Sequence, residues 1–249
     1  MQKILIIFLL LISISIFSVP KTKKLKKALN ISKIEAKLVK EFTKTKKDNK
    51  KINLELKNLL VNKESIDYNF KLLSKYISIT QSEDKSLRIL SWFRAKNKDY
   101  KNVDLLIQFK DKSNKLIVKK VDLKSVLYSV WINLKPSSYL KNKIHKIKIK
   151  NKDYYLSLAN GTYNRGFHHS SILIFSVEKS DIKFCVKCID KKYSLVKVPV
   201  TYKIDLKYDE KTKTISFNDF RFLKRSNIAL PTGKKVNLKL KDGKFVIIK

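Results

Sequence analysis

Residues 144–159, IHKIKIKNKDYYLSLA, carry the pattern that decides the fold of this chain. In the predicted strand Ile144–Lys150, histidine or isoleucine alternates with lysine from His145 onward, and this period of two residues is typical of a strand with one buried face. Asn151–Asp153 predicts a turn that leads into a second strand, Tyr154–Ala159. The stretch therefore predicts an antiparallel pair of strands.

The same period of two continues on both sides of this pair, with turn residues at short intervals. The strongest local signal is Asp242-Gly243, because this dipeptide supplies the positive φ angles that a type I′ hairpin turn needs. Asn160–His169 predicts a polar loop. The other predicted strands are Ile77–Thr80, Ser86–Phe93, Val103–Phe109, Leu116–Leu123, Val126–Ile132, Ile172–Val177, Ile182–Ile189, Val196–Tyr208, Thr214–Phe217, Val236–Leu240 and Phe245–Ile248.

Before Ile77 the apolar residues follow a helical period. Three helical segments are predicted: Lys21–Asn49, Ile52–Val61 and Ser65–Tyr76, the last with Ser65 as its N-cap. The apolar stripe of the first segment is narrow and consists of Leu25, Leu29, Ile34, Leu38 and Phe42. Helices followed by strands predict an α+β fold, with N-terminal helices (residues 19–76, Lys-rich) before a mostly antiparallel β-sheet domain (residues 77–249).

The first eighteen residues predict a signal peptide. Lys3 precedes an apolar run, Ile4–Phe17, and small or helix-breaking residues follow at Ser18 and Pro20. The run is shorter than the roughly 20 residues that a transmembrane helix needs. We expect an exported protein in the periplasm, on the outer surface or secreted, with an uncleaved N-terminal membrane anchor as the alternative.

The formal net charge of +36 suggests an anionic partner. Only five of the 57 basic residues are arginine, whereas nucleic-acid surfaces usually recruit arginine for bidentate contacts. Export also argues against nucleic acid. The charge therefore indicates either a coding bias toward lysine or an anionic envelope polymer or membrane surface as the partner; the sequence identifies no protein partner.

Two segments resemble a loosely defined set of exported bacterial proteins. One is Ile77–Asp84 leading into Leu87–Trp92, a turn followed by a strand that contains tryptophan. The other is Lys152–Leu158, a strand with Tyr-Tyr-Leu, followed by Ile172–Phe175. The resemblance implies an exported α+β module and carries over no catalytic residue. The chain departs from that set at Phe93–Lys96, where those proteins have a Gly-rich loop.

The sequence contains no recognisable catalytic set, phosphate loop or metal-binding motif, so we expect a binding protein without a cofactor. The alternative is a secreted enzyme of unrecognised type with residues 160–171 in its site, since loops often carry function. That segment combines glycines with aromatic and basic side chains. The candidate binding residues are Tyr163, Arg165, Phe167, His168 and His169.

Cys185 and Cys188 lie three residues apart in a predicted strand. In an extended strand, residues at that spacing lie about 10 Å apart and face opposite sides, whereas a disulfide needs Cα atoms within about 7 Å. Bonding would therefore require a turn or bulge. Two alternatives therefore remain: two free thiols, or a local disulfide, which the oxidising conditions met by an exported protein would favour.

Overall fold

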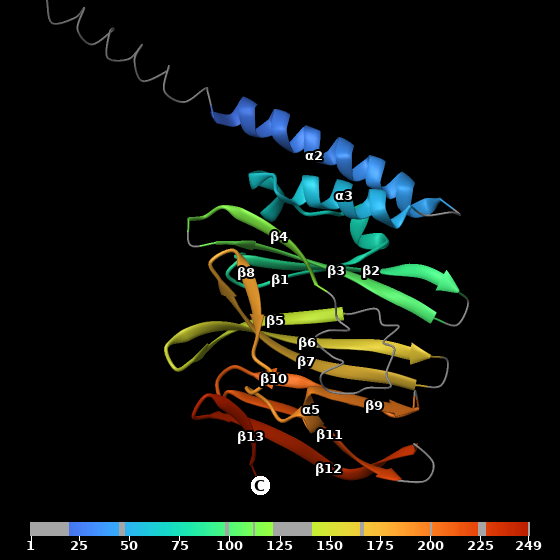
Figure 1. Cartoon of the computed structure of the whole chain (residues 1–249), viewed down its shortest axis with the longest axis vertical. Coiled ribbons are helices and arrows are strands. Elements are labelled where there is room, and N and C mark those ends of the chain that lie inside the picture. The colour runs from blue at the N-terminus through green and yellow to red at the C-terminus, as the bar shows by residue number, and fades with distance from the viewer. Residues whose placement is uncertain are drawn as a thin grey trace, which may run out of the picture. The chain divides into compact units, whose positions relative to one another are not determined.

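The computed structural model describes residues 20–44, 48–97, 100–111, 113–121, 141–164, 167–199, 201–223 and 228–248 (Figure 1). The predicted signal peptide, residues 1–18, and the predicted strand Val126–Ile132 lie outside these ranges. The chain divides into two compact units, one ending at Leu73 and the other beginning at Ser74. The described structure is mostly antiparallel β-sheet, with a small helical part toward the N-terminus.

The helical unit contains α2 (Pro20–Thr43), α3 (Asn49–Leu60) and the short 3₁₀ turn η1 (Lys63–Ile66). A second 3₁₀ turn, η2 (Leu73–Lys75), begins at its last residue. The carboxylate of Asp48 caps α3 by accepting the backbone N–H groups of Lys50 and Lys51, each at 3.0 Å.

The buried stripe of α2 differs in part from the predicted one. Ile31, Glu35, Leu38 and Phe42 are buried, at spacings of four, three and four residues, whereas Ile34 is only half-buried. Leu38 and Phe42 were expected in the stripe and are buried. The carboxylate of Glu35 occupies a further buried position that was not expected. The side chains of Leu25 and Leu29 lie outside the description.

The predicted helix Ser65–Tyr76 is wrong. Asn62, not Ser65, caps η1, and the Ser65 hydroxyl donates to the carbonyls of Leu60 and Asn62 at 2.9 and 2.6 Å. The Glu35 carboxylate accepts the backbone N–H groups of Leu72 and Leu73, each at 2.9 Å. Donors that would close helical turns are therefore used by a side chain on another helix.

The described strands of the second unit form three antiparallel sheets, which we call sheets A, B and C. Sheet A has the order β1 (Ser78–Gln81), β2 (Leu87–Asn97), β3 (Tyr100–Lys110), β4 (Leu116–Val121). Sheet B has the order β5 (Lys141–Ile149), β6 (Lys152–Asn164), β7 (Phe167–Glu178), β8 (Asp181–Phe184), and β9 (Leu195–Pro199) also pairs with β7. Sheet C has the order β10 (Lys207–Asp209), β11 (Thr214–Leu223), β12 (Ile228–Lys241), β13 (Lys244–Ile248), and a short helix, α5 (Lys191–Ser194), precedes β9.

Sheet B is the middle layer of this unit, as the order of the sheets in Figure 1 shows. Successive residues of a strand point to opposite faces, so its two faces form two separate cores. One face packs on sheet A through Tyr155, Leu173 and Phe175 against Leu87, Ile107 and Phe109. The other face packs on sheet C through Leu156, Ile172 and Ile174 against Ile215, Phe217 and Leu238.

The predicted turns are close to the observed ones. Asp242 and Gly243 have φ angles of 49° and 87° and join Lys241 to Lys244, which confirms the type I′ hairpin. The turn between β5 and β6 lies at Lys150 and Asn151, one residue before its predicted place, and both residues have positive φ.

Two predictions in the β unit are wrong. Asn160–His169 is not a loop, because β6 continues to Asn164 and β7 begins at Phe167, paired along this stretch. Val196–Tyr208 is not one strand, because β9 ends at Pro199, which lacks the N–H that a ladder needs. The chain leaves sheet B at Pro199 and enters sheet C as β10, and the intervening segment 203–206 lies along a cleft.

Candidate functional site

The predicted binding segment is part of the β6–β7 hairpin. Arg165 lies outside the described residues, and Tyr163 and Phe167 belong to β6 and β7, with side chains outside the description. His168 and His169 occupy successive positions of β7 and therefore point to opposite faces of sheet B. The two histidines do not form one site.

His169 lies on the face that packs on sheet A and is 3% exposed. His168 lies on the face toward sheet C, where one ring nitrogen, Nε2, is buried and has no hydrogen-bond partner among the described residues. His168 borders a cleft.

This cleft has a volume of about 310 Å³ and lies where sheet B meets the segment before β10. The Ser170 hydroxyl in it donates to the amide oxygen of Asn160, and therefore does not stand ready as a nucleophile for His168. The cleft has the dimensions and polarity for a small polar group. Its lining residues are Asn160, His168, Ser170, Lys203, Ile204, Asp205 and Leu206.

A different feature, the outward face of sheet C, was not predicted as a site. Val236, Leu238 and Leu240 of β12 face the core, so Lys235, Asn237, Lys239 and Lys241 face outward. The pairing register places charged, small polar and apolar side chains beside them on the neighbouring strands. These residues are Lys207, Asp209, Thr214, Ser216, Asn218, Lys244, Val246 and Ile248.

We call the surface formed by Lys239, Lys241 and Lys244 the lysine face. No acidic side chain of the described residues is paired with these three lysines. All three lysines are exposed. Lys241 lies directly opposite Lys244, a pairing of like charges that costs stability.

Two acidic groups beside the lysine face, Asp205 and Asp209, are engaged, whereas the exposed Asp242 in the β12–β13 turn forms no ion pair among the described residues. Asp205 accepts from Lys207 at 2.8 Å and lies 4.0 Å from Lys235. The Asp209 carboxylate accepts the backbone N–H groups of Lys211 and Thr212, at 2.8 and 3.3 Å. Hydrogen bonds from Thr212 lower the pKa of Asp209, so it stays ionised within its own turn.

Cys185 and Cys188 form a disulfide, with Cα atoms 5.4 Å apart. The predicted strand Ile182–Ile189 is too long, since β8 ends at Phe184 and the chain then turns. The backbone N–H of Cys185 donates to Ile174 of β7, and the carbonyl of Cys188 accepts from Phe245 of β13, both at 2.7 Å. The turn therefore links sheets B and C.

Potential metal ligands converge at Glu83, His145 and Glu210, the one such group in the part of the chain that the structure describes. The neighbouring Tyr208 ring lies 5.0 Å from the His145 ring, centroid to centroid. Burial, followed by the charges of Glu210 and Asp209, raises the pKa of Tyr208 to about 12. No metal site is expected here from the sequence, because the three residues are far apart in the chain.

Among the described residues, no helix has both the length and the apolar character that crossing a membrane requires. Comparison with protein-family models, with curated proteins and with solved structures finds no match for the chain. The resemblance to exported bacterial proteins therefore stays a prediction, and the function has to be argued from the site geometry.

Proposed function

We propose that this chain is an exported, non-enzymatic binding protein that attaches to an anionic polymer of the cell envelope through the lysine face of sheet C. The observation that carries the proposal is the exposed, unbalanced charge of Lys239, Lys241 and Lys244. Along β12, alternate residues lie about 6.8 Å apart, and paired strands lie about 4.8 Å apart. Lysine ammonium groups at such spacings suit a repeating row of phosphate or carboxylate groups.

Three further features support a binding role at an envelope surface. Ser, Thr and Asn side chains surround the lysines and offer hydrogen bonds to a polar chain. The disulfide fits an oxidising compartment, which favours export. Large aromatic side chains do not occur among the described outward positions of sheet C, and this composition favours a polymer over insertion into a membrane.

The enzyme alternative has weaker support. His168 and His169 lie on opposite faces of sheet B, and the Ser170 hydroxyl is bound to Asn160. The alternative of an N-terminal anchor concerns residues outside the described ranges and stays a prediction.

The proposal is tested with a triple variant, Lys239→Gln, Lys241→Gln and Lys244→Gln, and inorganic polyphosphate as the probe. Each lysine near an anionic surface contributes about 1 kcal/mol, so the triple variant should bind roughly 100-fold more weakly at low salt. The affinity of the native chain should fall as salt rises, because binding releases counterions. Isothermal titration calorimetry at several salt concentrations measures both effects.

The matched control carries the same change of net charge at a different place. Lys115, Lys179 and Lys183 are exposed at the β3–β4 turn, the β7–β8 turn and β8, so their triple change to Gln removes three positive charges from sheets A and B. We expect this control to change the affinity by less than about threefold. Equal losses in both triple variants, or an affinity that does not depend on salt, would show that the lysine face is not the site. Tighter binding to vesicles of anionic lipid than to polyphosphate would assign the face to a membrane instead.

A further inference from the structure

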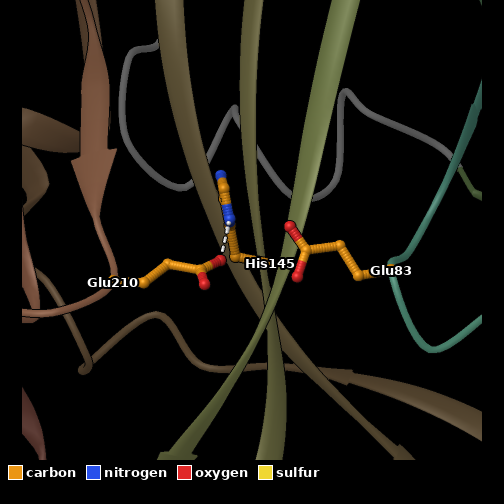
Figure 2. A group of neighbouring side chains, drawn as sticks. All are labelled: Glu83, His145 and Glu210. Atoms are coloured by element: carbon orange, nitrogen blue, oxygen red, sulfur yellow. Dashed lines mark hydrogen bonds and ion pairs between the residues drawn. The ribbon is translucent and has the colours of Figure 1, made fainter.

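Glu83, His145 and Glu210 meet at the edge strand of sheet B, although they come from three different sheets. His145 belongs to β5, Glu83 to the turn between β1 and β2 of sheet A, and Glu210 to the turn after β10 of sheet C. Figure 2 shows His145 between the two carboxylates, which reach toward it from either side. The cluster therefore spans all three layers of the β unit.

The distances within the cluster are close to those of a metal site. One ligand atom from each residue lies within 4.8 Å of the other two, and Nδ1 of His145 lies 2.7 Å from Oε1 of Glu210. Metal–ligand bonds of about 2.0–2.2 Å place two ligand atoms at most about 4.4 Å apart. A small rotation of the two glutamate side chains, both exposed, would close the remaining gap.

The two carboxylates of the cluster would be stabilised by a cation. One hydrogen bond to Glu210 satisfies His145, yet a second carboxylate, Glu83, approaches the same place. Although the chain carries a net charge of +36, no lysine among the described residues forms an ion pair with Glu83 or Glu210. Two carboxylates left this close repel each other, and a divalent cation would turn that repulsion into attraction.

The surroundings hold the His145 side chain and the turn that carries Glu83. The His145 side chain is 12% exposed and packs beside the Tyr208 ring. Asp84, next to Glu83, accepts hydrogen bonds from Ser82 and Ser86 at 2.7 Å and from Lys146 of β5 at 3.1 Å, which fixes this turn against sheet B. Fixed supporting residues reduce the entropy that a ligand set loses when it closes on a metal.

We propose that His145, Glu83 and Glu210 bind a divalent transition-metal ion of the Zn²⁺ class, which ties sheets A, B and C together. An imidazole nitrogen with two carboxylates favours Zn²⁺ over Mg²⁺ or Ca²⁺, which prefer all-oxygen sites. Three protein ligands leave at least one position for water. This site is separate from the lysine face and does not depend on the proposed function.

The test is a Zn²⁺ titration of the untagged protein by calorimetry, with the melting temperature measured with and without the metal. Cys185 and Cys188 are bonded to each other and offer no thiolate, so thiol binding does not interfere. We expect the native chain to bind Zn²⁺ and its melting temperature to rise, because the metal binds the folded state. Glu83→Gln and Glu210→Gln should each weaken binding about tenfold or more.

Glu83 and Glu210 are exposed, so these two variants are expected to fold even if His145→Ala does not. The matched control is Glu64→Gln, which removes a carboxylate away from the cluster and should bind Zn²⁺ as the native chain does. The proposal is overturned if the native chain takes up no Zn²⁺, if the cluster variants bind it as well as this control, or if Mg²⁺ stabilises the chain equally.

Discussion

The helical unit and the β unit are organised by different kinds of interior group. In the helical unit, the Glu35 carboxylate is 1% exposed and accepts hydrogen bonds from the Tyr68 hydroxyl and from the backbone N–H groups of Leu72 and Leu73, all at 2.9 Å. In the β unit, the middle sheet buries apolar side chains on both faces. The helical unit depends on hydrogen bonds to one buried carboxylate, whereas the β unit depends on the burial of apolar side chains. The two units should therefore respond differently to substitutions.

The first prediction concerns packing in the β unit and has the largest expected effect. Leu156 is 0% exposed on the face of sheet B that meets sheet C. Leu156→Ala should lower the free energy of unfolding by about 4 kcal/mol, because it removes apolar contacts and leaves a cavity. Trp92 is buried in β2 of sheet A, so tryptophan fluorescence during urea denaturation reports on the β unit.

The control for this prediction is Leu230→Ala, on β12, where the leucine is 41% exposed. A surface change of this kind should stay within about 0.5 kcal/mol. If Leu156→Ala costs no more than Leu230→Ala, the two-sided core is not what stabilises the β unit.

The second prediction breaks the polar centre of the helical unit. Glu35→Ala removes the acceptor of three donors at once and should cost about 3 kcal/mol, since unsatisfied buried donors lose their full solvation. Glu35→Gln keeps the size and one carbonyl acceptor, and should cost about half as much. The helical band in far-UV circular dichroism, followed through urea denaturation, measures both variants.

Lys33→Ala is the matched control for Glu35, because Lys33 is exposed on the same helix. We expect a change within about 0.5 kcal/mol. A Glu35→Ala variant as stable as Lys33→Ala would mean that Leu72 and Leu73 do not need this carboxylate to hold their conformation.

The comparison of the two units also explains which parts of the fold could be predicted from the sequence. The strands show their period directly, and Asp242-Gly243 encodes its turn locally, so these predictions came close. The segment Ser65–Tyr76 has a helical pattern, but Glu35, more than thirty residues away, takes its backbone donors. No local pattern reports such a long-range hydrogen bond.

The site predictions failed or stayed open for related reasons. Strand pairing extends β6 and β7 through the glycine-containing segment that was predicted to be a loop. It also places His168 and His169 on opposite faces of sheet B. The lysine face needs the register of β10–β13, and the metal cluster needs three sheets to meet. In the sequence, these lysines and glutamates look like the many others of the chain. They can be recognised as sites only when the positions of the strands are known.

Asp84 shows what a carboxylate contributes to stability when it is only partly buried. Asp84 joins the β1–β2 turn to sheet B, and its side chain is 31% exposed, against a fully buried Glu35. Burial raises the pKa of Asp84, but hydrogen bonds from Ser86, Ser82 and Lys146 outweigh it and lower the pKa to about 2. Because this folded-state pKa lies below the ordinary value of 3.8, the stabilisation is present above about pH 4 and is lost as the pH falls through about 2.

Solvent screening reduces the effect of a partly exposed group, so Asp84→Asn should cost about 1 kcal/mol at neutral pH, less than Glu35→Ala. The difference in free energy of unfolding between the native chain and Asp84→Asn should close between about pH 4 and pH 2, because protonated Asp84 then resembles asparagine. Urea denaturation followed by tryptophan fluorescence across this range measures it. A difference that stays constant down to pH 2 would mean that Asp84 acts through its shape and neutral hydrogen bonds. The contrast with Glu35 would then lie in burial alone, and the charge of the turn would contribute nothing to joining sheets A and B.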